Sequence, residues 1–175
     1  MRKDGGVSGW FAGCAWPEDG EVGAFLARVQ SDAAGVLDGL VAPDATSAFP
    51  VMGCLLTVEV PGIPASEWPV HAHQLQVLRT PGFLGGYWGC SHLWDEFDPG
   101  EPDSFSVDAG LAPEVAAAQA LAWVRTQLVR PRALQEWDRK WRTPGRRWVL
   151  EDTGTVLGGP APGPRARIRT TRLNG

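Results

Sequence analysis

Three residue types are scarce in this chain. It has two lysines, Lys3 and Lys140, against 14 arginines, one asparagine, Asn174, and two isoleucines, Ile63 and Ile168. The scarce residues have AT-rich codons, whereas the abundant glycine, proline, arginine and tryptophan have GC-rich codons. The scarcity therefore indicates mutational bias in a high-GC bacterial genome rather than a function.

Long apolar runs and paired cysteines are also missing. No apolar run approaches the roughly 18 residues that a membrane helix needs, which predicts a soluble protein. The cysteines Cys14, Cys54 and Cys90 are odd in number and widely spaced, so they predict reduced thiols in a cytoplasm rather than a disulfide framework. The chain has neither a phosphate-binding glycine loop nor a serine nucleophile elbow, which excludes two common enzyme signatures.

The 175 residues suffice for one domain with a hydrophobic core. Apolar residues at helical spacing predict two main helices, about 20–41 and 111–130. An apolar run over 51–60 predicts a buried strand, and two turn signals predict hairpins. We therefore expect an α+β fold in residues 1–157, with an antiparallel sheet of about five or six strands covered on one side by the helices. Residues 158–175 are a Gly/Pro linker and a basic tail, either disordered or a late edge strand.

All three histidines of the chain fall close together, and a cysteine falls with them. They form the pairs His71-x-His73 and Cys90-x-His92, on either side of the turn signal Pro81-Gly82. If Pro81-Gly82 is a two-residue hairpin turn, His71 faces His92 and His73 faces Cys90, and all four project from one face of the ribbon. Because zinc takes imidazole and thiolate ligands, the hairpin is a candidate zinc site.

Other interpretations of this hairpin stay open. The same face carries Leu75, Val77, Leu84 and other apolar residues, which favours a core face, with the histidines in packing or polar-network roles, over a metal site. Glycines in the second strand favour a bulge, which would change the register. A thiol mechanism, with Cys90 activated by His73 or His92, is a third possibility, although no local signature of a nucleophile supports it.

Charge is divided along the chain. Residues 1–129 carry a net charge of −11 and residues 130–175 a net charge of +7. Residues 95–110 are expected to form an acidic loop, which includes Asp95, Glu96 and Asp98. The tail holds Arg165, Arg167, Arg169 and Arg172. Such asymmetry is typical of a nucleic-acid-binding tail, but it also arises when the two halves attract each other in the fold, which we favour because the whole chain is at −4.

Nine tryptophans are the other notable feature. Trp137, Trp141 and Trp148 lie among basic residues in a predicted hairpin around Thr143-Pro144-Gly145, where they would cover one sheet surface. Tryptophan is enriched at protein interfaces and can also stack on single-stranded bases. The hairpin is therefore a candidate binding surface.

The segment 123–154 carries a resemblance. It contains Arg130-Pro131 after a helix, then Trp137 and Trp148 in the hairpin, and then Asp152-Thr153-Gly154. It resembles the C-terminal module of small uncharacterised actinobacterial proteins, in which a helix ending in Arg-Pro feeds a tryptophan-containing hairpin that closes on Asp-Thr-Gly. The resemblance implies a source and a module, and it implies no activity.

These observations favour a small cytoplasmic binding protein without catalysis, which uses the acidic loop and the tryptophan hairpin on a protein partner, has no contact with a membrane and needs no cofactor. The alternative is a zinc-dependent enzyme or zinc-stabilised domain built on His71, His73, Cys90 and His92. A third interpretation is contact with nucleic acid through the arginine tail.

Overall fold

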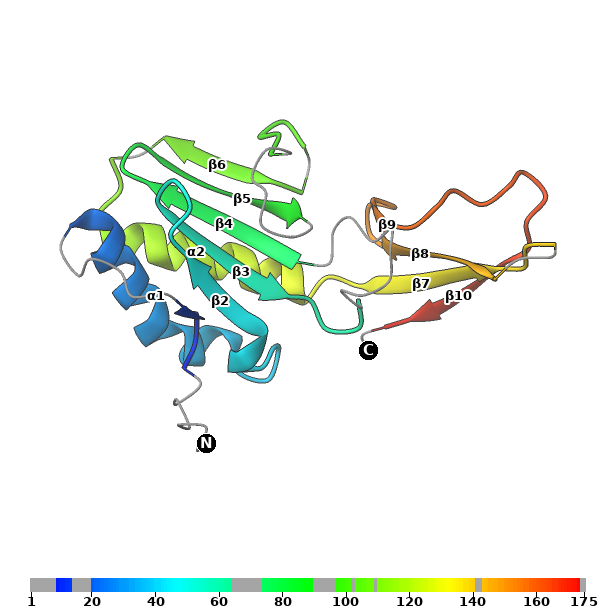
Figure 1. The fold of residues 1–175 in the computed structure, drawn as a ribbon, viewed down its shortest axis with the longest axis horizontal. Helices are drawn as coiled ribbons and strands as arrows, with labels where there is room; N and C mark the ends of the chain where they lie inside the picture. Colours follow the sequence, from blue (N-terminus) through cyan, green and yellow to red (C-terminus); the bar gives the residue numbers. More distant parts are fainter. Residues whose placement is uncertain are drawn as a thin grey trace, which may run out of the picture.

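The computed structural model describes residues 9–13, 20–63, 74–89, 97–101, 103–108, 110–140 and 143–173. In these residues the chain forms the expected α+β fold, with two α-helices, a six-stranded sheet and a separate four-stranded sheet (Figure 1). The six-stranded sheet and the helices make up the main body. The four-stranded sheet lies beside the main body, at the right of Figure 1.

Both predicted helices are present. Helix α1 spans Glu21–Leu37 and buries an apolar stripe that includes Phe25, Val29 and Ala33. It ends before the predicted residue 41, because Asp38 leaves the helical conformation with a ψ of 136° and Gly39 follows with a positive φ of 76°. Helix α2 spans Pro113–Leu128 and begins on the proline that favours a first helical position. The two helices pack against each other on one face of the main sheet.

The main sheet has the strand order β1-β2-β3-β4-β5-β6. Its strands are β1 (Ala12–Gly13), β2 (Thr46–Phe49), β3 (Cys54–Glu59), β4 (Gln74–Thr80), β5 (Phe83–Gly89) and β6 (Phe105–Asp108), and a short 3-10 turn, η1 (Pro43–Ala45), precedes β2. All neighbours are antiparallel except β1 and β2, which are parallel, so the sheet is mixed. The prediction of a loop over 95–110 was wrong for 105–108, which pair with β5 as the edge strand.

Side-chain alternation decides what each face of the main sheet carries. Cys54, Leu56, Val58, Leu75 and Val77 belong to the core shared with the helices. Leu55, Leu78 and Tyr87 have the opposite parity and are also buried, so the centre of the sheet is covered on both faces. This burial agrees with the apolar run predicted for β3.

The glycines of β5 make room for aromatic rings and leave the register unchanged. A Cβ on Gly86 would lie 2.6 Å from the Phe105 ring and 2.9 Å from the Trp123 ring of α2. The two rings themselves pack with centroids 5.1 Å apart. The bulge that these glycines favour in the sequence is absent between β4 and β5.

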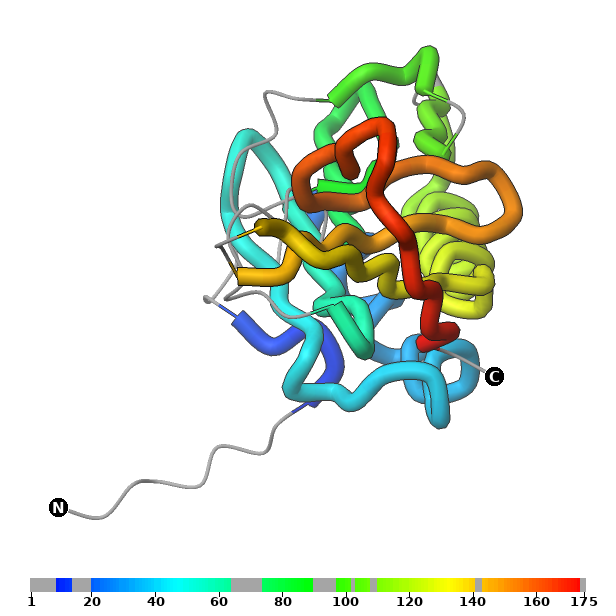
Figure 2. Tube along the Cα trace, turned by 90° about the vertical axis from the view of Figure 1, so that its right-hand side faces the viewer, coloured from blue at the N-terminus to red at the C-terminus, as the bar shows by residue number. Residues whose placement is uncertain are grey.

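The second sheet has the strand order β10-β7-β8-β9. Its strands, all antiparallel, are β7 (Arg132–Trp137), β8 (Gly145–Leu150), β9 (Val156–Gly158) and β10 (Ile168–Arg172). It faces the viewer in Figure 2, which is turned to look at the molecule from this end. Trp148, Leu150 and Leu157 join the core cluster of the main body, which anchors this sheet. Of the two expected states of the tail, residues 168–172 adopt the edge strand.

Candidate functional site

The hairpin predicted around Pro81-Gly82 is present with the predicted register. Thr80 faces Phe83 across the turn, Leu75 faces Trp88, and the last described pair is Gln74 and Gly89. The candidate ligands His71, His73, Cys90 and His92 lie outside the described residues, as do Asp95, Glu96 and Trp141. Their arrangement on one face therefore stays a prediction.

The face of the hairpin that carries Leu75, Val77 and Trp88 is the one covered by the helices. Leu75 and Val77 are almost fully buried there, and the Trp88 Nε1 donates a hydrogen bond to Gln127 Oε1 of α2 at 2.9 Å. Among the residues that the structure describes, no group of three or more histidine, cysteine, aspartate or glutamate side chains could hold a metal ion. Cys54, the one cysteine among the described residues, is a free thiol in the core, and burial raises the pKa of this thiol to about 12.

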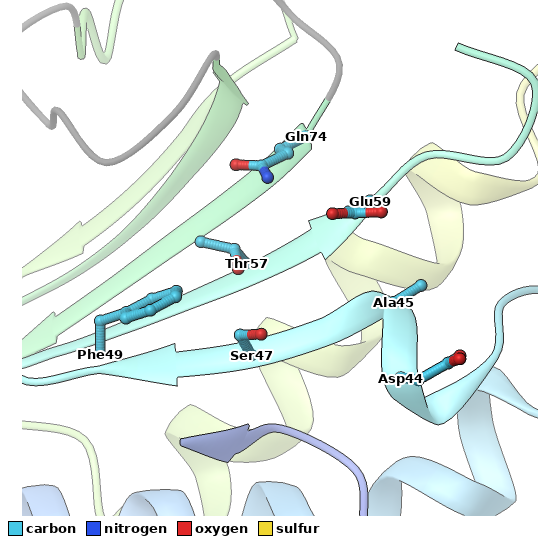
Figure 3. A pocket seen from close by; sticks show the side chains of 7 residues that line it. All are labelled: Asp44, Ala45, Ser47, Phe49, Thr57, Glu59 and Gln74. Atoms are coloured by element: carbon cyan, nitrogen blue, oxygen red, sulfur yellow. The ribbon is translucent and has the colours of Figure 1, made fainter. Parts of the chain in front are cut away.

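A small concavity lies on the opposite face of the main sheet (Figure 3). It is lined by Asp44, Ala45, Ser47, Phe49, Thr57, Glu59 and Gln74 and encloses about 190 Å³. Ligand pockets usually enclose about 300–1,000 Å³, so this concavity is smaller than a typical ligand pocket. Sequence reasoning did not find it, since its lining comes from η1, three strands and no recognisable motif. The sticks in Figure 3 show that this lining carries two carboxylates, two hydroxyls and an amide.

The most extensive polar cluster in the described residues centres on Arg130, just after α2. Its Nε and Nη2 donate to the two carboxylate oxygens of Asp152 at 2.8 and 2.9 Å, in a bidentate pair. Its Nη1 donates to Asp103 and, at 2.9 Å, to Gln127 Oε1. The Thr155 hydroxyl donates to the other oxygen of Asp103 at 2.8 Å. We call these five residues the Arg130 cluster.

The Arg130 cluster joins parts of the chain that sequence alone left separate. It ties the end of α2 to the turn between β8 and β9 and to the acidic segment that precedes β6. Burial acts to lower the pKa of Arg130, but its hydrogen bonds to Asp152 and Asp103 outweigh burial and raise that pKa. The hydrogen bond from Arg130 in turn lowers the pKa of Asp152. Acidic and basic halves thus attract each other here, as the charge pattern favoured.

The Arg130 cluster also explains the spacing of the Arg-Pro and Asp-Thr-Gly motifs. Arg130 contacts both Asp152 and, at 3.2 Å, the Thr153 hydroxyl, while Gly154 adopts a positive φ of 75° that closes the turn. Asp98, by contrast, is exposed and accepts a hydrogen bond from the Gly100 amide at 2.8 Å, so it stabilises its own turn.

The two described tryptophans of the hairpin lie on opposite faces of the second sheet. Trp148 pairs with Leu134 on the core side, whereas Trp137 pairs with Gly145 on the other side. The expectation that they cover one surface was therefore wrong. In the observed register Trp137 lies opposite Gly145, where a Cβ would lie 2.2 Å from the ring, and an odd number of positions separates Trp137 from Leu134, the partner of Trp148. Both rings are at most 4% exposed and present no area to a partner.

The exposed chemistry of the second sheet is cationic. Residues 138–140 and 165–169 meet at the end of the sheet far from α2, since Ile168 is the partner of Trp137. They hold five basic side chains, Arg139, Lys140, Arg165, Arg167 and Arg169, which we call the basic tip, and one acid, Asp138. All five are exposed. Arg169 lies 3.4 Å from Asp138, and within the described residues no acidic side chain pairs with the other four.

Arg172, the remaining arginine of the predicted tail, lies at the opposite end of β10. Its Nε is 3.1 Å from Glu151 Oε2. The four arginines that were predicted as one cationic tail thus divide into three at the basic tip and one that is already paired near the main body.

Arg79 is the largest fully buried side chain of the described residues, at 1% exposure. Its Nη2 donates to the Leu111 carbonyl at 3.1 Å and lies 3.7 Å from a carboxylate oxygen of Glu21. Its Nε and Nη1 have no hydrogen-bond partner in the part of the chain that is described. A buried guanidinium with two unmatched nitrogens is energetically costly.

Comparison of the chain with models of protein families, with curated proteins and with solved structures finds no match to any of them. In the described part of the chain, neither helix has the length and apolar character needed to cross a bilayer.

Proposed function

We propose that this chain is a binding protein without catalysis, which holds an acidic partner protein at the basic tip of its second sheet. The observation that carries the proposal is the set of four exposed cations, Arg139, Lys140, Arg165 and Arg167, that lack an acidic neighbour among the described residues. Concentrated charge of one sign on a projecting element speeds encounter with a partner of opposite charge.

The contact differs from the tryptophan surface expected from the sequence. Trp137 and Trp148 are buried, so they stabilise the sheet and leave the cationic side chains to meet the partner. Asp95 and Glu96 remain predicted contacts of the acidic loop. The non-catalytic part of the proposal rests on the few catalytic residue types in the sequence.

A protein partner is favoured over nucleic acid by the charge of the remainder of the molecule. The whole chain carries −4, and residues 1–129 carry −11, which repels a polyphosphate lying along the main body. Arg172, which was expected to contact phosphate, is paired with Glu151. The basic tip gathers four exposed cations that no acidic side chain of the described residues pairs with, and a small acidic surface matches it.

The test is the binding of a fluorescent eight-residue peptide of alternating glutamate and valine, followed by anisotropy. Arg165→Glu combined with Arg167→Glu should weaken binding about tenfold or more, because both charges are reversed at the contact. The matched control, Arg28→Glu with Arg125→Glu, makes the same change of charge on exposed helix positions and should leave affinity within about twofold. Absence of binding to the peptide overturns the proposal. Tighter binding to duplex DNA, lost steeply with salt, favours nucleic acid instead.

We propose the zinc site as the second candidate, because one observation favours it. The β4–β5 register follows the prediction up to Gln74 and Gly89, the pair next to His73 and Cys90. Elemental analysis of protein purified without chelator should then find about one zinc per chain, lost in the variant His71→Ala with His73→Ala. A folded protein without metal in both forms overturns this candidate.

A further inference from the structure

The hydrogen bonds between β10 and β7 determine which backbone groups of β10 face the free edge of the sheet. The Leu173 amide, next to the strand, donates to the Arg132 carbonyl at 2.9 Å, so the backbone amide and carbonyl of residue 173 face β7. In an antiparallel pair, hydrogen-bonded positions alternate, so the backbone amides and carbonyls of Arg169 and Thr171 also face β7. The amides and carbonyls of Ile168, Thr170 and Arg172 therefore point away from the sheet.

Nothing in the described residues covers this edge. β10 is the terminal strand of its sheet, and all five of its side chains are exposed. Its register with β7 is regular over five residues, with no proline and no bulge. Natural edge strands are usually shortened, bulged, proline-containing or charged. Of these devices β10 has only charge, and that charge is entirely positive.

The sign of the charge selects the occupant of the edge. A second copy of the chain pairing through β10 would add a strand whose only charged residues are Arg169 and Arg172, so the two edges would bring only positive side chains to each other, which opposes self-association. An acidic strand meets the same arginines favourably. Charge therefore protects the edge against this chain and leaves it open to a strand of opposite sign.

We infer that β10 accepts an acidic extended segment of the partner protein as an added strand. The main-chain groups of Ile168, Thr170 and Arg172 would bond to the segment, and its carboxylates would contact Arg167 and Arg169. This inference rests on the proposed function, and it specifies how the acidic partner binds. Backbone pairing supplies affinity for an extended chain, and the arginines supply the preference for acidic side chains.

The test uses a proline at an outward-facing amide. Thr170→Pro removes an amide that β7 does not use, so the sheet should stay intact, which thermal unfolding checks. Binding of the glutamate–valine peptide should fall about tenfold or more, while the matched Thr170→Ala, which keeps the amide, should bind like the wild type. A second measurement needs no variant: hydrogen exchange of the Ile168, Thr170 and Arg172 amides should slow about tenfold or more when the peptide binds.

The possible failures are distinguishable. If Arg165→Glu with Arg167→Glu abolishes peptide binding but Thr170→Pro binds normally and the three amides stay unprotected, strand addition is overturned and the proposed function stands. If the peptide does not bind at all, the proposed function itself is overturned. A dimer in sedimentation that Thr170→Pro dissociates would show that the occupant is a second copy, which overturns an acidic partner at this edge.

Discussion

Replacing Arg130 by methionine tests whether the Arg130 cluster holds the second sheet to the main body. The side chains of Arg130 and Asp103 are 12% and 10% exposed, so their ion pair is largely shielded from water. The change leaves the Asp103 carboxylate, among the described residues, with only the Thr155 hydroxyl as a donor. A buried carboxylate that loses its charged partner is destabilised because its desolvation is no longer offset.

The size of the effect follows from the separate contacts. Hydrogen bonds to charged groups contribute about 1.5–3 kcal/mol each when shielded, which applies to Asp103. The pair with Asp152, whose side chain is 40% exposed, contributes at most about 1 kcal/mol. We therefore expect Arg130→Met to lower the free energy of unfolding by about 2–4 kcal/mol, of which the Asp103 contact is the larger part.

The assay is urea unfolding followed by tryptophan fluorescence at neutral pH. Asp103→Asn is measured alone and together with Arg130→Met, and the pair should show a coupling of about 1–3 kcal/mol. Arg146→Met is the control, because its pair with Glu136 is 47% and 28% exposed and should contribute at most about 1 kcal/mol. A loss below about 1 kcal/mol for Arg130→Met, or simple additivity with Asp103→Asn, would refute the reasoning.

Two further predictions concern buried groups of the main body. Arg79→Met should leave the free energy of unfolding unchanged or raise it by up to about 3 kcal/mol, because two nitrogens without a hydrogen-bond partner are removed from the core. The measurement is urea unfolding, with Arg125→Met at an exposed position as the control. A decrease of more than about 1 kcal/mol for Arg79→Met would contradict this prediction. The pKa of Cys54 is raised by burial from 9.0 to about 12, so the folded state keeps the thiol proton that the unfolded state loses, and stability should decline as pH rises from about 9 to 12. Cys54→Ala should lack that part of the decline when unfolding is compared with the wild type across this pH range, and equal slopes would contradict it.

Local signals in the sequence were sufficient where neighbours along the chain interact. Pro81-Gly82 sets the turn, and the register of β4 and β5 follows from it without further information. Helical spacing and the flanking prolines predicted α1 and α2 to within a few residues. The buried strand β3 was also predicted, because a run of apolar residues is suited to a sheet covered on both faces.

Contacts between distant residues were decided only by the tertiary structure. The segment 105–108 is short and polar in part, and it becomes β6 because β5 offers a free edge beside it. The register of β7 with β8 pairs Trp137 with Gly145, where no side chain stands in the way of the ring, and pairs Trp148 with Leu134 on the opposite face.

The charge pattern of the chain predicts attraction between its two halves, but the tertiary structure determines which residues form ion pairs. Arg130 and Asp103 meet because α2 ends where the segment before β6 passes the turn after β8. The same fold leaves Arg165 and Arg167 without an acidic partner among the described residues, at the far end of a sheet. Sequence determines which side chains can pair, whereas the distances that select among them exist only once long-range strand pairing and packing have fixed the backbone.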